Sequence, residues 1–328
     1  MCGSAKLRKD IVTLYLIVVT SILWLDQIGT GPPRSAEGEL LFISDTDAID
    51  AGRESNSVYR VALDDGGMKR ILGSIPHGEG YLRISDIDCH AESGSLVIAS
   101  GRHDLNGFHH ALLDGSMLHL DRPASGRLLT SLQQIALAPD GIAVIVSRQY
   151  REYPQLRYGL VSGDLASRVY NSIKPPSPER SYLSPLWSPA GGSIAYIAVK
   201  HAPDAPPSYS LVIATPDGSG ERVIYDTPLA LTDIAWSPDG GWIAAVVGGQ
   251  LHKLRPDGND LTRLSHHPGG IAGPRWSPDS RRISYVAPSS YPGFNQLMVM
   301  DADGGNIRRL ANIRGEVVNG CWVSGASG

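Results

Sequence analysis

A five-residue motif that recurs at regular intervals constrains the fold of this chain more than any other feature of its sequence. It reads Trp236-Ser237-Pro238-Asp239-Gly240, recurs as Trp276-Ser277-Pro278-Asp279-Ser280, and has weaker copies that start at Trp187 and Leu137. Ser, Pro, Asp and Gly in this order suit the four positions of a type I turn. A short apolar run rich in β-branched residues follows each copy, so each copy predicts a strand, a tight turn and a second strand.

The spacing of the copies predicts the architecture. When the repeats are aligned on the position of the Trp, they start at Cys89, Leu137, Trp187, Trp236, Trp276 and Trp322. Successive starts are separated by 48, 50, 49, 40 and 46 residues. Each repeat continues with a third strand, an Asp-Gly turn and a short fourth strand. An all-β repeat with a period of roughly 40–50 residues is typical of the four-stranded antiparallel blades of a propeller.

The two ends of the repeat region complete each other. The last start, Cys321-Trp322-Val323, is followed by no strand, whereas the first strands, Glu39–Ser44, Val58–Leu63 and Met68–Leu72, lack a start before them. Together they make one blade. The sequence therefore predicts an all-β, six-bladed β-propeller over residues 39–328, closed by the C-terminal strand, which joins the N-terminal blade and protects the sheet edges.

These W-S-P-D-G repeats resemble the WD40-like (PD40) β-propeller repeats of the TolB family, and they are also similar to the propeller domains of prolyl-oligopeptidase-type peptidases. The resemblance covers roughly residues 39–325 and implies the fold, but it implies no chemistry, because a fold does not determine a function. TolB itself has an additional α/β domain ahead of its propeller. Residues 29–38 leave no room for that domain, so we expect a TolB-like propeller without it.

The N-terminus differs from the rest of the chain. Lys6, Arg8 and Lys9 precede an apolar run from Ile11 to Leu25, which is typical of an export signal or a signal anchor. The run is shorter than the roughly 20 apolar residues of a full membrane span. We expect residues 1–28 to form one hydrophobic helix that is a signal peptide or signal anchor, and residues 29–38 to be a linker. Basic residues on the N-terminal side predict an extracytoplasmic body, periplasmic or extracellular.

Charge and cysteine content exclude several kinds of partner. The formal net charge is −4 with both signs dispersed, and no run of Lys and Arg occurs, so nucleic acid is not expected as a partner. Membrane contact is expected through the N-terminal segment only, and the body is expected to be monomeric. Three cysteines make neither a disulfide framework nor a zinc site. Cys89 and Cys321 could form one bridge, but we expect them to be buried free thiols.

Two kinds of connection alternate in a four-stranded blade. The turns after the Trp and the Asp-Gly turns are short, whereas the connections between second and third strands and between blades are long and varied. We call the side of the ring that carries the long connections the long-loop face. Binding residues gather on variable loops, and Tyr and Arg are enriched at interfaces. The candidates there are Arg102, His103, Tyr150, Tyr153, Tyr182, Tyr209 and Tyr291. Alternatively, these loops merely cover the blades, with Tyr packed on Pro.

A second candidate set follows from the register of the repeats. Three residues before each Trp position stand Asp86, Gln134, Ser184, Asp233, Gly273 and Asn319. They begin the innermost strands and should ring the mouth of the central channel. Asp86, Asp233 and Asn319 would then form a polar ligand or ion site, or else such side chains hydrogen-bond the backbone of neighbouring blades.

Histidines raise the question of a metal. His77, His266 and His267 lie in connections between blades, where they are candidates for partner or ligand binding. A zinc site needs three or four convergent ligands. We expect no metal and no cofactor.

Catalytic motifs are missing from the sequence. It has no G-x-S-x-G elbow, no P-loop and no G-x-G-x-x-G after a strand, and no peptidase domain is expected after the closing strand. The leading hypothesis is a non-catalytic, extracytoplasmic propeller scaffold that binds a protein or cell-envelope component through its long-loop face. The alternative is a carbohydrate-active or other hydrolase or lyase with its site at the mouth of the channel, with or without a metal. A third option is a structural domain that only holds other envelope parts.

Overall fold

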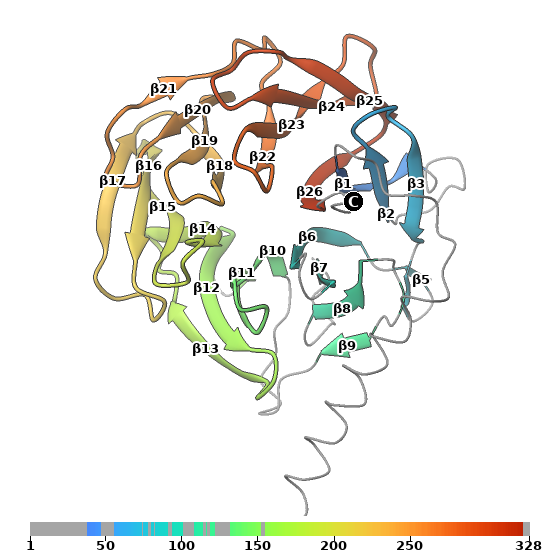
Figure 1. The fold of residues 1–328 in the computed structure, drawn as a ribbon. Helices are drawn as coiled ribbons and strands as arrows, with labels where there is room; N and C mark the ends of the chain where they lie inside the picture. The colour runs from blue at the N-terminus through green and yellow to red at the C-terminus, as the bar shows by residue number, and fades with distance from the viewer. Residues whose placement is uncertain are drawn as a thin grey trace, which may run out of the picture.

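Six four-stranded antiparallel sheets surround a central channel in the computed structural model of the chain (Figure 1). The structure describes residues 38–46, 56–73, 75–77, 80–81, 83–90, 94–100, 108–113, 116, 119–121, 132–151 and 155–323. The predicted six-bladed β-propeller is confirmed. Residues 1–28 and nearly all of the linker 29–38 lie outside this part of the chain, so the signal and the linker stay predictions. Among the described residues, no helix is long and apolar enough to cross a membrane.

Within each blade the strands are ordered from the channel outwards. Blade 1 consists of β26 (Val317–Val323), β1 (Glu39–Ser44), β2 (Ser57–Ala62) and β3 (Met68–Leu72). Blade 2 consists of β6 (Ile84–His90), β7 (Ser95–Ser100), β8 (Phe108–Leu112) and β9 (His119–Asp121). Blade 3 consists of β10 (Leu132–Leu137), β11 (Ala143–Tyr150), β12 (Arg157–Asp164) and β13 (Val169–Lys174).

The remaining blades repeat this arrangement. Blade 4 consists of β14 (Arg180–Trp187), β15 (Ile194–Ala202), β16 (Ala205–Ala214) and β17 (Arg222–Thr227). Blade 5 consists of β18 (Leu231–Trp236), β19 (Ile243–Val247), β20 (Gln250–Leu254) and β21 (Thr262–Arg263). Blade 6 consists of β22 (Ala272–Trp276), β23 (Arg282–Pro288), β24 (Phe294–Asp301) and β25 (Arg308–Arg314). A two-stranded hairpin, β4 (Pro76–His77) and β5 (Gly80–Tyr81), connects blades 1 and 2.

Ring closure takes place in blade 1, as the sequence predicts. The last strand, β26, pairs antiparallel with β1, and the pairing places Trp322 opposite Leu40 and Val317 opposite Ser44. Both ends of the described chain therefore enter blade 1 at the end of the channel where Trp322 lies. Every innermost strand runs from the long-loop face towards the Trp positions, because the chain enters each blade by a connection on that face.

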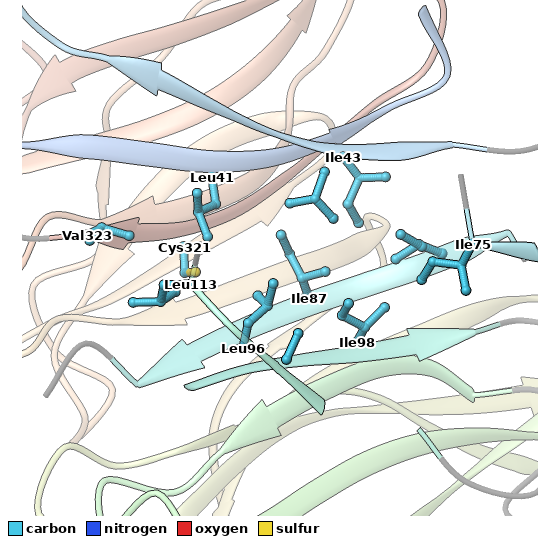
Figure 2. Packing of buried hydrophobic residues seen from close by; sticks show 12 residues of the cluster. Leu41, Ile43, Ile75, Ile87, Leu96, Ile98, Leu113, Cys321 and Val323 are labelled. Carbon is cyan, nitrogen blue, oxygen red and sulfur yellow. The ribbon is translucent and has the colours of Figure 1, made fainter. Parts of the chain in front are cut away.

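Apolar packing between neighbouring blades forms the core. In β1 all six residues are buried, and alternate side chains point to opposite faces of the strand. Leu41 and Ile43 pack against blade 2 (Figure 2). Leu40 and Phe42 pack against blade 6. Each of the six apolar clusters lies between two adjacent blades, so a blade buries both of its faces only when it has a neighbour on each side.

The repeated motif forms the tight turn that its residue order predicts. The amide of Gly240 donates to the carbonyl of Ser237 at 2.8 Å, which closes the turn. The Ser237 hydroxyl accepts from the amide of Trp242 at 2.9 Å, and Asp239 Oδ1 accepts from the amide of Gly241 at 2.9 Å. The Ser and Asp side chains therefore hold the turn by binding backbone amides of the same hairpin.

In two copies of the motif the Trp joins blades, because its indole reaches the innermost strand of the preceding blade. The indole of Trp236 instead donates to the carbonyl of Gly240 in its own turn at 3.2 Å. Trp276 Nε1 donates to the carbonyl of Ala235 at 3.1 Å, and Trp322 Nε1 donates to the carbonyl of Arg275 at 3.0 Å. In both pairs the acceptor is the residue immediately before the Trp position of the preceding blade. The structure thus confirms the Trp as a large residue that fills the space between packed sheets.

A disulfide joins Cys89 in β6 to Cys321 in β26, so the expectation of two free thiols is wrong. Cys89 occupies the Trp position of blade 2, and Cys321 immediately precedes Trp322 in the preceding blade. The two cysteines therefore repeat the relationship of Trp276 to Ala235, with their Cα atoms 6.1 Å apart. Between blades 1 and 2 a covalent bond takes the place that the indole hydrogen bond has between blades 5 and 6 and between blades 6 and 1. It holds the closing strand at Cys321, whose side chain lies among the apolar residues between blades 1 and 2 (Figure 2).

Removing this bond should destabilise the ring. Because it links residues 232 positions apart, we expect the double variant Cys89→Ala/Cys321→Ala to lose about 2–5 kcal/mol of unfolding free energy. Urea denaturation followed by Trp fluorescence measures this loss. A reductant should lower the midpoint of the natural protein and leave that of the double variant unchanged. Equal midpoints for the oxidised protein and the variant would contradict the expectation.

Candidate functional site

Two cavities lie at the two ends of the innermost strands. The first, which we call the mouth cavity, measures about 220 Å³ and lies where these strands begin, on the long-loop face. It is lined by residues that include Ser85, Asp86, Gln134, Asp233, Gly273 and Asn319. The second, the Trp cavity, measures about 350 Å³ and lies where the strands end, among Trp187, Trp236, Trp276 and Trp322. Arg275 lines both cavities and so lies between them.

The structure brings Asp86, Asp233 and Asn319 together at the mouth cavity, where their register places them. Each of them also hydrogen-bonds a neighbouring innermost strand, which is the following one for Asp86 and Asp233 and the preceding one for Asn319. Asp86 Oδ2 accepts from the amide of Ile135 at 3.0 Å. Asp233 Oδ2 accepts from the amide of Gly273 at 3.4 Å, and Asn319 Nδ2 donates to the carbonyl of Gly273 at 2.7 Å.

The two remaining polar positions of this ring make the same kind of bond. Gln134 Oε1 accepts from the amide of Ser184 at 2.7 Å, and Ser184 Oγ donates to the carbonyl of Thr232 at 3.0 Å. Side chains at one register position thus connect consecutive blades around the channel. These bonds hold the innermost strands in register and fix the geometry of the mouth cavity.

A buried and a half-buried carboxyl group and one guanidinium dominate the electrostatics of the channel. Asp86 is 5% exposed, and its Oδ1 lies 3.6 Å from Arg275 Nη2. Burial raises the pKa of Asp86 to about 7, although the charge of Arg275 and the amide of Ile135 act in the opposite direction. Asp88 lies two residues further along β6, and burial raises its pKa as well. Asp88 Oδ2 accepts from the amide of Leu137 at 2.7 Å.

The other candidates on the long-loop face do not form a single site. Tyr182 is 8% exposed and packs edge-to-face on Tyr196, with ring centroids 5.9 Å apart, so it belongs to the core between blades 3 and 4. Tyr209 lies in β16 and packs against the cluster between blades 4 and 5. Tyr150 ends β11 with the Arg148 guanidinium 4.6 Å above its ring. Tyr291 is 69% exposed.

The histidines are equally dispersed. His266 is exposed, and His267 is held by Gln250, whose Oε1 accepts from the His267 amide at 2.8 Å. His77 lies in β4, but its side chain is outside the described part of the structure, as are Arg102, His103 and Tyr153 in full. Among the described residues, no group of three or more His, Cys, Asp and Glu could hold a metal ion.

Sequence reasoning missed Arg275, Asp88 and the Trp cavity. Asp86 and Asp88 are two residues apart in one strand, so their shared face follows from the period of a strand. Arg275 immediately precedes Trp276, at the position that receives the indole of the next blade, and this register marks it as a channel residue. The Trp cavity follows from the motif itself, because its tryptophans converge wherever the blades do.

Comparison with known proteins supports the fold and leaves the chemistry open. No protein-family model matches the chain. A curated relative, dipeptidyl-peptidase 5 of Porphyromonas endodontalis, is 31% identical over 110 residues, which are 32% of this chain and only 16% of that protein. The chain therefore matches about one sixth of the length of this relative.

Two solved structures show how widely this architecture is shared. TolB from Acinetobacter baumannii superposes with a TM-score of 0.67 at 15% identity, covering 93% of this chain and 71% of that one. An oligogalacturonate lyase in complex with manganese superposes with a TM-score of 0.52 at 14% identity, covering 85% and 76%. At such identities the likeness shows the fold alone. The chain has the six-bladed propeller fold of TolB, as the resemblance implies.

The raised pKa of Asp86 predicts a pH dependence of stability. Between pH 3.8 and about 7 the folded protein holds a proton that the unfolded chain releases, so this residue makes stability fall as pH rises. Asp86→Asn removes the titration and keeps an acceptor for Ile135. We expect the unfolding free energy of the variant, relative to the natural protein, to rise across this window by at most about 4 kcal/mol. Urea denaturation at several pH values measures the difference, and a constant difference would contradict the expectation.

The exposed Asp204 provides the matched control for this experiment. Asp204→Asn makes the same chemical change on the surface, so the pH dependence of its stability should follow that of the natural protein. If both variants changed the pH dependence equally, burial of Asp86 could not be the cause.

Proposed function

We propose that the chain is a non-catalytic, extracytoplasmic propeller scaffold that binds a protein or cell-envelope partner through its long-loop face. One observation carries this proposal. A cavity of about 440 Å³ lies on that face between blades 6 and 1, where the loop after β23 meets the segments that follow β1 and β25. Tyr291 at this cavity is 69% exposed, and exposed aromatic residues beside a concave surface are characteristic of protein-binding sites.

The cavity has the mixed character of a protein interface. Pro288, Pro292 and Phe294 supply apolar surface, and Asp45 and Glu316 supply acidic groups. Hydrogen bonds hold the walls together. Asp45 Oδ1 accepts from the amide of Glu316 at 2.7 Å, and Ser289 donates through its amide to the carbonyl of Phe294 at 3.0 Å. A surface whose loops are fixed in this way loses little conformational freedom when a partner binds.

Two independent features support an extracytoplasmic location. The disulfide between Cys89 and Cys321 suits an oxidising compartment, because such bonds rarely persist in the cytosol. The basic and apolar order of residues 1–28 is that of an export signal or anchor. On this proposal residues 1–28 target or tether the chain, residues 29–38 are a linker, and residues 39–328 form a monomeric binding body.

The arrangement at the channel favours a scaffold over an enzyme. Asp86 binds the amide of Ile135 and the guanidinium of Arg275, and Gln134 binds Ser184, so these side chains already have structural partners. The alternative of a carbohydrate-active hydrolase or lyase is supported by the carboxyl groups of Asp86 and Asp233 at one cavity and by the fold shared with oligogalacturonate lyase. Metal analysis and a polysaccharide screen separate the two, since turnover would overturn the scaffold proposal.

Truncation of the exposed aromatic tests the proposed binding face. We expect Tyr291→Ala to weaken capture of the envelope partner by about tenfold or more, because central aromatic residues dominate interface energies. Quantitative pull-down from an envelope extract, followed by titration of the captured protein, measures the effect. Leu261→Ala removes a comparable exposed side chain, 43% exposed, from the short connection between β20 and β21 and serves as control. Equal capture of the partner by both variants would contradict the proposal that the long-loop face is the binding surface.

A further inference from the structure

One of the six equivalent positions in the ring of innermost strands lacks a side chain. Five blades place Asp86, Gln134, Ser184, Asp233 or Asn319 there, whereas blade 6 has Gly273. Its φ of +57° is one that few residues with a side chain adopt, and a Cβ atom would meet the Cβ of Asn319 at 3.1 Å. The ring of polar side chains is therefore interrupted between Asp233 and Asn319, which both contact the backbone of Gly273.

Asn319 carries a buried acceptor without a partner next to this gap. The residue is 1% exposed and lines the mouth cavity. Its Nδ2 donates to the carbonyl of Gly273 at 2.7 Å and to Ser284 Oγ at 2.9 Å. Because a carbonyl only accepts, the amide nitrogen must face Gly273, and this fixes the orientation of the group. Asn319 Oδ1 then accepts no hydrogen bond, which is unfavourable for a buried oxygen.

Asp233 is the second polar group beside Gly273 whose hydrogen-bonding capacity is only partly satisfied. Its carboxylate is half-buried at the mouth cavity, and its bond to the Gly273 amide, at 3.4 Å, is long. The equivalent bond from Asp86 to Ile135 measures 3.0 Å, and Asp86 has Arg275 3.6 Å away as a counter-ion. No ion pair of Asp233 is found among the described residues. Asn319 Oδ1 therefore lacks a donor, and the Asp233 carboxylate at the same cavity has one long hydrogen bond and no ion pair among the described residues.

These requirements define the ligand. A primary ammonium group has three donors, no acceptor and a single positive charge, so it suits Asn319 Oδ1 and Asp233 together. A divalent cation fits less well, because it takes six or more oxygen ligands, of which Asp233 and Asn319 supply few. The volume of about 220 Å³ is below that of a typical small-molecule pocket and suits one side chain that enters end-on.

We propose that the mouth cavity binds a lysine side chain of a partner protein, whose ammonium group donates to Asp233 and Asn319 in the gap beside Gly273. This inference rests on the proposed function, because the lysine belongs to the partner bound at the long-loop face. The mouth cavity opens on that same face, so a partner seated there can insert a side chain into the channel. The lysine replaces the side chain that blade 6 lacks and completes the polar ring.

A small lysine derivative tests the site without the partner. The full propeller is titrated with N-acetyl-lysine methylamide and, separately, with the norleucine analogue, which has the same stem and no ammonium group. We expect saturable binding of the lysine compound only, visible as a concentration-dependent rise in Tm. Asp233→Asn should weaken this binding about tenfold or more, whereas Asp204→Asn, the same change at an exposed acid, should leave it unchanged.

Three results would overturn the proposal. They are equal binding of the norleucine compound, unchanged binding by Asp233→Asn, and saturable binding of Ca²⁺ at the same site in place of the amine. The two proposals also fail separately. Suppose that Tyr291→Ala abolishes partner capture, whereas Asp233→Asn and acetylation of the partner's lysines leave it unchanged. This result would contradict only the lysine site. If the lysine compound binds but no partner is captured in a way that depends on Tyr291, only the proposed binding face is contradicted.

Discussion

Apolar packing between blades is the interaction on which the rest of the structure depends. The second strand of a blade has no polar face, since alternate residues such as Leu41 and Phe42 pack against different neighbours. A row of such blades would leave one apolar face exposed at each end, and only a closed ring removes both. Closure in turn requires that β26, from the far end of the chain, pairs with β1. The disulfide beside this pairing adds a covalent link at the place where the ring would open.

Much of this architecture is visible in the sequence because the repeat is visible. A turn motif held by its own hydrogen bonds recurs in four of the six blades, and the spacing that it sets, extended to Cys89 and Trp322, gives the number of blades and the strand left over at Trp322. The register of the channel follows in the same way, and it placed Asp86, Asp233 and Asn319 correctly at one end. Periodic features are predictable because local chemistry repeats them.

Features that depend on contacts across blades were not predictable in this way. Cys89 and Cys321 are 232 residues apart, and their pairing follows only when the rule that joins Trp276 to Ala235 is known. Tyr182 stands beside prolines in a segment that has the composition of a loop, yet it lies in β14 and packs on Tyr196. In both cases the decisive fact is which neighbouring blade the side chain meets, and one strand by itself does not contain that information.

Function in such a ring must come from departures from the repeat. Positions that recur from blade to blade serve the fold that the blades share, as the hydrogen bonds of Ser237 and Asp239 do by holding their turn. Gly273 departs from its equivalents by having no side chain, and it leaves Asn319 Oδ1 without a partner. Arg275 departs by placing a charge between two cavities. The loop of Tyr291 departs by exposing an aromatic ring. All three belong to blade 6, whose innermost strand lies beside the closing strand, so the irregular chemistry is concentrated where the ring is completed.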